Sequence, residues 1–234
     1  MGACLPQVND LMKLSGVPPI ISKLLIILTL FEASAFSSEP RHLQSFSEGT
    51  DGWVVLDSTD GHPKKPLKIE VWAKAGGVND SPHLQGTRSS GNGVYFSVDA
   101  KVRGEFGGDL RRYASERSHD LEIAFSMKAT DATEGASGKR RPILWLYENE
   151  GTGWECALRE DHPCLDETWN EYKVIINVNW TNEEAEANGW KASPGATSFQ
   201  DTIQNIGRLR LGTTAPGGYG HIVSLDELSI SPSQ

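Results

Sequence analysis

The chain has 234 residues, of which 38% are hydrophobic and 23% are charged, a composition typical of globular proteins and unlike that of disordered or collagen-like chains. Its 22 Lys and Arg stand against 31 Asp and Glu, a net charge of −9, so phosphate backbones would repel it and we expect no nucleic-acid partner. Three cysteines are too few for a disulfide-built miniprotein or a zinc site with four thiolates.

The chain begins with a segment that predicts export. Residues 24–31 (LLIILTLF) form an apolar run that follows Lys23 and precedes Ala33-Ser34-Ala35. A membrane-spanning helix needs about 20 apolar residues, whereas a short run followed by an A-x-A site is typical of a secretory signal peptide. We therefore expect a signal peptide over residues 1–35, with an uncleaved anchor as the alternative.

The sequence leaves two possible start codons and more than one possible location for the exported protein. No basic residue precedes Lys13, and a start at Met12 instead of Met1 would give a signal of more ordinary length. The mature protein, residues 36–234, is expected to be secreted and extracellular, or periplasmic or at the cell surface if the source is bacterial. We expect no membrane insertion after cleavage.

Alternating apolar and polar residues, enriched in β-branched and aromatic types, predict nine strands. They are residues 53–56, 67–73, 94–98, 121–128, 143–147, 154–158, 172–178, 208–211 and 222–230. In the fourth strand, Leu121, Ile123, Phe125 and Met127 share one face and polar residues share the other. This strand is therefore expected to have one buried and one solvated face.

One segment near the C-terminus departs from the strand pattern and predicts a short helix. Apolar residues recur at i, i+4 and i+7, a capping-box pair accompanies them, and a glycine follows at the position of a helix end. These residues are Phe199, Ile203 and Ile206, then Thr197 with Gln200, and Gly207. Nine strands and one short helix predict one all-β domain over residues 36–234, a jelly-roll-type antiparallel β-sandwich of galactose-binding-like architecture.

Two covalent modifications are expected in an exported chain. Cys156 and Cys164 remain after signal cleavage, and a local disulfide between them would contribute about 2.5 kcal/mol through loop-closure entropy. The alternative is a metal site that uses both thiols with His162, although the spacing fits no standard zinc pattern. The sequon N-W-T begins at Asn179, which is a possible site of N-glycosylation if the source is a eukaryote.

Four segments carry a family resemblance. The run YFSVDAKVRGEFGGDL at 95–110 combines an aromatic pair, a Lys-x-x-Gly turn, a further aromatic residue and Gly-Gly-x-Leu. TWNEYKVIIN at 168–177, SFQDTIQNIGRLRL at 198–211 and SLDELSI at 224–230 follow in order. Together with the opening at residue 45 they resemble the laminin IV domain, also called laminin B. The resemblance implies an extracellular, non-catalytic β-sandwich and gives no ligand.

All seven tryptophans lie in the mature chain. Exposed indole rings can stack on sugar rings while carboxylates and amides bind the hydroxyls. Trp180 and Trp190 lie in a polar stretch and Trp154 follows a turn, so these three are candidate glycan-binding residues, with core packing or loop anchoring as the alternative. The tryptophans in apolar strands are expected in the core, namely Trp53, Trp145 and Trp169.

Carboxylates near both ends of the domain suggest a structural calcium site. Jelly-roll modules can join their first and last strands through Ca²⁺ that is held by carboxylate and carbonyl oxygens. Glu48 and Asp51 lie in the opening turn, and Asp226 and Glu227 lie in the last strand. The alternative is a solvated acidic surface.

A catalytic interpretation rests on one short motif. Glu148-Asn149-Glu150 places two carboxylates two residues apart, as in some jelly-roll glycoside hydrolases, but no third acidic residue completes a Glu-x-Asp-x-Glu pattern. We therefore expect a secreted non-catalytic module that binds a glycan or an extracellular-matrix component. The alternatives are an adhesive module that contacts proteins without binding sugar, and a glycoside hydrolase that uses Glu148 and Glu150.

Overall fold

A computed structural model describes residues 42–57, 72–87, 93–115, 118–131, 141–149, 151–158, 162–214 and 221–233. The chain divides into two units, residues 1–38 and 39–234, and all described residues belong to the second. The expected signal peptide over residues 1–35 therefore lies outside the described residues. Within the described ranges, no helix has the length and apolar character that a membrane span requires.

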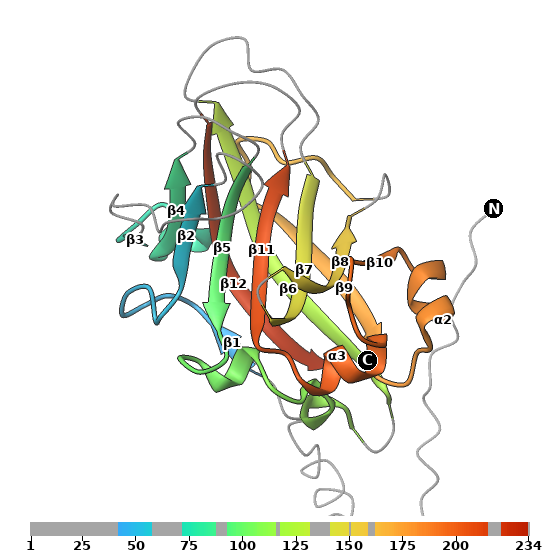
Figure 1. The fold of residues 1–234 in the computed structure, drawn as a ribbon. Helices are drawn as coiled ribbons and strands as arrows, with labels where there is room; N and C mark the ends of the chain where they lie inside the picture. Colours follow the sequence, from blue (N-terminus) through green and yellow to red (C-terminus); the bar gives the residue numbers. More distant parts are fainter. Residues whose placement is uncertain are drawn as a thin grey trace, which may run out of the picture. The chain divides into compact units, whose positions relative to one another are not determined.

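The described residues form two six-stranded sheets, which lie one behind the other in Figure 1. Sheet A has the order β3 (Trp72–Ala73), β4 (His83–Thr87), β12 (His221–Pro232), β6 (Asp120–Asp131) and β9 (Asn170–Asn177), and β1 (His42–Gln44) pairs with β12. Sheet B has the order β10 (Trp190–Ala192), β8 (Thr152–Ala157), β7 (Arg141–Asn149), β11 (Arg208–Thr214), β5 (Gly93–Asp99) and β2 (Val54–Asp57). Neighbouring strands are antiparallel throughout. The predicted jelly-roll-type β-sandwich is confirmed.

The core fills the space between the two sheets. In β6 the four residues predicted to share a face, Leu121, Ile123, Phe125 and Met127, are fully buried. Sheet B contributes a matching inner row, because Leu211 of β11 lies opposite Phe96 of β5 and Leu144 of β7. The two-residue period of a strand sends the alternate residues of each strand away from this core.

The helix α3 (Phe199–Gln204) lies where the helical pattern predicts it, but its caps differ. Ser198 is the N-cap and accepts a hydrogen bond from a backbone N–H of the first turn, so the predicted pair of Thr197 with Gln200 is one residue early. Gly207 is not the glycine that ends the helix. A Cβ atom at Gly207 would lie 2.2 Å from the carbonyl oxygen of Glu148, so only glycine allows the chain to pass β7 this closely.

The expectation of a single helix is wrong, since α2 (Asn182–Ala187) is a second one. Thr181 and Glu184 form a full capping box at its start, and this T-x-x-E signal is visible in the sequence. The structure also contains β1, β4 and β10, three short strands that the alternation did not predict. Of the strand predicted over 67–73, only β3 lies within the described residues.

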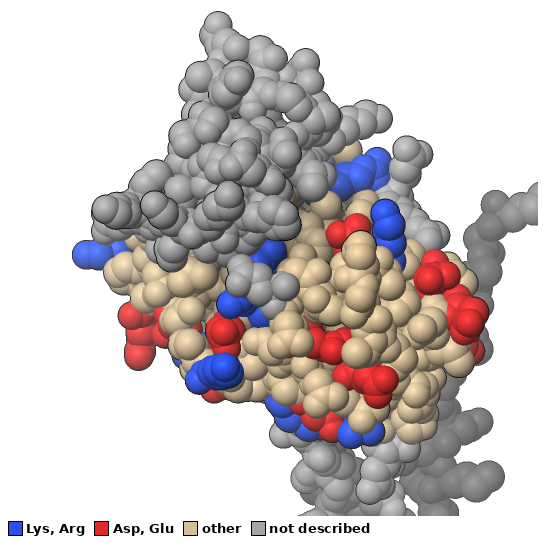
Figure 2. All heavy atoms as spheres, viewed as in Figure 1, with Lys and Arg blue, Asp and Glu red and all other residues tan. Residues whose placement is uncertain are grey.

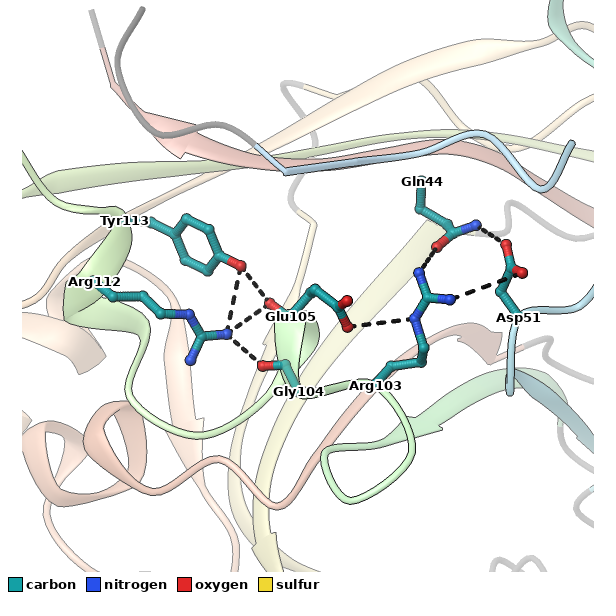
Figure 3. A network of polar contacts seen from close by, with 7 residues as sticks. All are labelled: Gln44, Asp51, Arg103, Gly104, Glu105, Arg112 and Tyr113. Carbon is teal, nitrogen blue, oxygen red and sulfur yellow. Dashed lines mark hydrogen bonds and ion pairs between the residues drawn. The ribbon is translucent and has the colours of Figure 1, made fainter.

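The laminin-like segment, residues 95–110, comprises most of β5 and part of the corner between β5 and β6. This corner contains the short helices η3 (Gly104–Phe106) and η4 (Leu110–Tyr113) (Figure 3). The Arg112 guanidinium donates to the carbonyl oxygens of Gly104, Glu105 and Gly107 at 2.5, 2.9 and 2.8 Å. The Tyr113 hydroxyl donates to the same Glu105 carbonyl at 2.7 Å. A Cβ atom at Gly107 would lie 2.0 Å from a neighbouring Cβ, so the glycine of this motif is required for the close packing of the corner.

Candidate functional site

The outer side of sheet B carries a cluster of large side chains that is separate from the core. Tyr95 of β5 and Ile143, Trp145 and Tyr147 of β7 form this cluster. Arg210 of β11 lies in register with Trp145 on one side and with Ser97 of β5 on the other. We call Tyr95, Ser97, Trp145, Tyr147 and Arg210 the aromatic face.

The side chains of the aromatic face contact one another in a fixed arrangement. The rings of Tyr95 and Trp145 meet edge to face at 5.3 Å. The guanidinium of Arg210 lies 5.0 Å from the ring centroid of Tyr147 and 5.8 Å from that of Tyr95, within the range of a cation–π interaction. The Trp145 indole N–H donates to Glu155 of β8 at 2.9 Å. Four neighbouring strands thus contribute to one surface.

A glycine makes room for this arrangement. Gly212 of β11 lies opposite Tyr95 in the sheet register. A Cβ atom at Gly212 would lie 2.7 Å from Cδ1 of the Tyr95 ring, which is too close for any residue with a side chain. The missing side chain lets the Tyr95 ring lie across β11 toward Trp145.

Burial sets the electrostatics of the aromatic face. The four clustered residues are 7–9% exposed, and Arg210 is 6% exposed. Burial raises the pKa of the Tyr147 hydroxyl, while the nearby Arg210 charge opposes the rise. In the part of this view that is not grey, Figure 2 shows both acidic and basic side chains at the surface.

One polar group on this face has unmet hydrogen-bonding capacity. Ser97 is 1% exposed, and its hydroxyl has no hydrogen-bond partner among the described residues. A buried polar group without a partner costs about 1–3 kcal/mol. The hydroxyl of a ligand could supply the missing hydrogen bond.

Two of the three predicted glycan-binding tryptophans are buried. Trp154 is 1% exposed and Trp190 is 2% exposed, and both rings meet Phe199 of α3 edge to face at 5.2 Å. The expectation that they present a ring face to solvent is wrong, because α3 packs over both. Trp180 is half-buried, with its ring 6.1 Å from that of Phe199, and it lines a groove beside β9.

The tryptophans predicted in the core fall into three different places. Trp53 is a core residue, as predicted. Trp145 is buried but belongs to the aromatic face. Trp169 is half-buried, donates its indole N–H to Gly76 at 3.1 Å and lies 4.6 Å under the ammonium of Lys128, so its expected core position is wrong.

The four carboxylates of the predicted calcium site do not form one. Asp51 accepts a hydrogen bond from Gln44 and lies 3.8 Å from Arg103 (Figure 3). Asp226 is fully buried and accepts hydrogen bonds from the backbone N–H of Val78, at 2.9 Å, and from the hydroxyl of Ser81. Among the residues that the structure describes, no three His, Cys, Asp or Glu side chains could hold a metal ion.

The reason is that Asp51 and Asp226 already have other partners, whereas Glu48 and Glu227 face solvent. The strand order on which the prediction depended is correct, since β1 pairs with the last strand. Glu227 follows Asp226 at a bulge, with a left-handed φ of 51°, and its side chain is exposed. Glu48 is exposed as well. The acidic pairs therefore serve the fold and the solvated surface.

The predicted disulfide is absent, because Cys156 and Cys164 are both thiols. Cys156 belongs to β8 of sheet B and packs with the core. Cys164 lies near Tyr172 of β9 in sheet A, where it contributes to a rise in the pKa of the tyrosine hydroxyl that burial dominates. The alternative metal site with His162 is not formed by the described residues either. Asn179 is exposed, and its glycosylation stays a prediction.

One of the two candidate catalytic carboxylates has a structural partner. Glu148 accepts hydrogen bonds from the hydroxyls of Thr197 and Thr202, and these bonds fasten α3 to the end of β7. Glu150 lies outside the described residues. The Glu148 carboxylate therefore has a structural role, since its hydrogen bonds hold α3 against β7.

The sequence holds a signal for the aromatic face that the strand alternation alone does not reveal. Both faces of β7 are apolar, because Ile143, Trp145 and Tyr147 on one face alternate with leucines on the other. A strand with two apolar faces is typical of a strand that is covered on both sides. That pattern predicts that the outer face of β7 is covered. The residues of β5 and β11 that lie beside it are known only from the order of strands in the sheet.

No protein-family model matches the chain, and no curated protein matches it. Among solved structures, it is similar to the family 11 carbohydrate-binding module of the cellulosomal cellulase Lic26A-Cel5E of Clostridium thermocellum, with 10% identity over 84% of this chain and 97% of that one and a TM-score of 0.49. The L4b domain of human laminin alpha-2 has 10% identity, coverages of 84% and 99%, and a TM-score of 0.45. A family 30 carbohydrate-binding module of C. thermocellum has 14% identity, coverages of 79% and 95%, and a TM-score of 0.42. These likenesses concern the fold alone.

Proposed function

We propose that this domain is a non-catalytic module that binds a glycan chain on the aromatic face of sheet B. The observation that carries the proposal is a group of side chains on a sheet face outside the core. It consists of three aromatic rings, the guanidinium of Arg210, and the hydroxyl of Ser97, which has no hydrogen-bond partner among the described residues. A sugar ring has apolar C–H faces and a rim of hydroxyls. The rings of Tyr95, Trp145 and Tyr147 can pack against the C–H faces, and Arg210 and Ser97 can form hydrogen bonds with the hydroxyls.

The charged groups beside the aromatic face already have partners, which favours a ligand without a strong net charge. Arg208, beside Arg210 on β11, lies 3.5 Å from Asp99, and Glu155 is engaged by Trp145. The net charge of −9 disfavours an acidic polysaccharide. A neutral polysaccharide does not meet this repulsion.

Burial of the rings affects the kinetics of binding. Because the rings of Tyr95, Trp145 and Tyr147 are less than a tenth exposed, a ligand can reach their faces only after a local rearrangement. Association that requires such a rearrangement is slower than the typical rate constant of about 10⁵–10⁷ per molar per second. The proposed function also fits the exported location that residues 1–35 predict, where polysaccharides are accessible.

The test is a screen of the protein on an array of glycans and polysaccharides, followed by titration of any ligand that is retained. Tyr147→Ala should weaken binding by a factor of about 10 or more, since one buried aromatic anchor contributes about 1.4 kcal/mol or more. Trp169→Ala, a half-buried tryptophan next to sheet A, is the matched control and should bind as the parent does. A folded protein that retains no glycan would refute the proposal and favour the adhesive alternative.

A further inference from the structure

A hollow lies beside the edge of sheet A and does not include any residue of the aromatic face. It has a volume of about 320 Å³ and lies between β8 of sheet B, the edge strand β9 of sheet A and α2. Trp180 and Ile175 supply apolar surface, and His162, Lys173 and Asn188 supply polar groups. We call this hollow the edge groove.

The apolar wall of the edge groove is partly open to solvent. Ile175 is 39% exposed, although it is a large aliphatic residue on a strand. Trp180 is half-buried and packs against the core while it also lines the groove. Of the three tryptophans that the sequence suggests as sugar platforms, Trp180 alone keeps substantial exposure.

The positive charge of Lys173, on the polar rim of the edge groove, is compensated by neighbouring carboxylates. Its ammonium lies 3.2 Å from Glu122 and 3.7 Å from Glu171, so the charge is balanced outside the groove. Asn188 donates one amide hydrogen to the carbonyl oxygen of Glu184 at 2.9 Å, which fixes the amide at the end of α2. His162 and Asn188 can then exchange hydrogen bonds with a ligand that bears no charge.

We propose that the edge groove is a separate binding site for a single neutral sugar residue. Its volume is at the lower end of the range of small-ligand pockets, about 300–1,000 Å³, which suits one ring better than a chain. One half-buried indole beside a few polar groups is the combination that a ring with an apolar face and a hydroxyl rim requires. This site does not depend on the aromatic face.

The test uses the whole protein and a panel of neutral methyl hexosides. The indole N–H signal of Trp180 in a proton–nitrogen correlation spectrum is identified by its loss in Trp180→Phe. At least one hexoside should shift that signal in a saturable way, with a dissociation constant on the order of millimolar. If no hexoside moves the signal at about ten times that concentration, the proposal is wrong.

Two matched variants test whether the shift of Trp180 reports binding in the edge groove itself. Ala187→Phe adds a ring from the exposed end of α2, where Ala187 lines the groove, and should weaken hexoside binding by a factor of about 10 or more. Glu183→Phe adds the same ring at an exposed position on the same helix and should leave binding unchanged. Equal effects of both variants would overturn the proposal.

The same experiment distinguishes this site from the aromatic face. Tyr147→Ala should leave the hexoside-induced shift of Trp180 intact, even where it removes polysaccharide binding. Ala187→Phe should weaken the hexoside-induced shift of Trp180 and leave polysaccharide binding intact. Loss of the Trp180 shift in Tyr147→Ala would overturn the assignment of a separate site, whatever the outcome for the polysaccharide.

Discussion

Replacing Phe199 with alanine should destabilise the domain more than any other change in α3. Phe199 is fully buried, and its ring contacts three tryptophans: Trp154 and Trp190 at 5.2 Å and Trp180 at 6.1 Å. These rings come from β8, from β10 and from the turn before α2. Phe199 therefore holds α3 against the edge of sheet B.

The expected loss follows from the size of the cavity that the substitution creates. A buried Phe→Ala change costs about 3–5 kcal/mol, and each aromatic contact that is lost adds about 0.5–1.5 kcal/mol beyond area burial. We expect a decrease of about 4 kcal/mol in the free energy of unfolding, since the remaining rings partly fill the space. For a domain of this size that corresponds to a fall in Tm of about 8–16 °C.

The assay is urea unfolding followed by tryptophan fluorescence, with the midpoint and the slope fitted separately. The midpoint should fall while the slope stays constant, because the same surface is exposed on unfolding. Phe199→Leu is the control and should lose less than half as much, since most of the volume is kept. A decrease below about 1 kcal/mol in Phe199→Ala would show that α3 is not held in this way.

The described contacts also predict the response to three other changes. Asp226→Ala should lower the free energy of unfolding by about 3 kcal/mol in the same assay, because it leaves the Val78 N–H and the Ser81 hydroxyl without their acceptor; a loss below about 1 kcal/mol would contradict this. Burial, and then the charge of Lys128, lower the pKa of His83 from 6.5, so the neutral form is favoured on folding and stability should fall as the pH drops below about 6.5. Thermal unfolding across that range should show a shallower fall for His83→Gln, and parallel profiles would refute the assignment. Adding calcium or a chelator should leave Tm unchanged, because Asp51 and Asp226 have other partners; a rise in Tm with calcium would support the metal site.

Features that depend on local periodicity could be predicted from the sequence. The alternation in β6 identified which residues enter the core, and every one of the four, from Leu121 to Met127, is fully buried. The helical stripe at Phe199 and Ile203 placed α3 correctly. A strand has a period of two and a helix a period of 3.6, so a few consecutive residues suffice to show which face is apolar.

Which residues are covered, and by what, depends on packing between segments that are distant in the chain. The polar neighbours of Trp190 suggest exposure, but the residue pairs with Cys156 of β8 and its ring packs against Phe199 of α3. Asp226 has the chemistry of a calcium ligand, yet the turn at Val78 and Ser81 uses its oxygens. Neither partner could be identified from the residues that flank Trp190 or Asp226.

The aromatic face shows the same division between local and distant information. Tyr95, Trp145 and Arg210 lie on β5, β7 and β11, and only the order of strands in sheet B makes them neighbours. Each strand's pattern shows that it has two faces. Which distant strand lies beside it is fixed by the packing of the whole domain, and the candidate site depends on that packing.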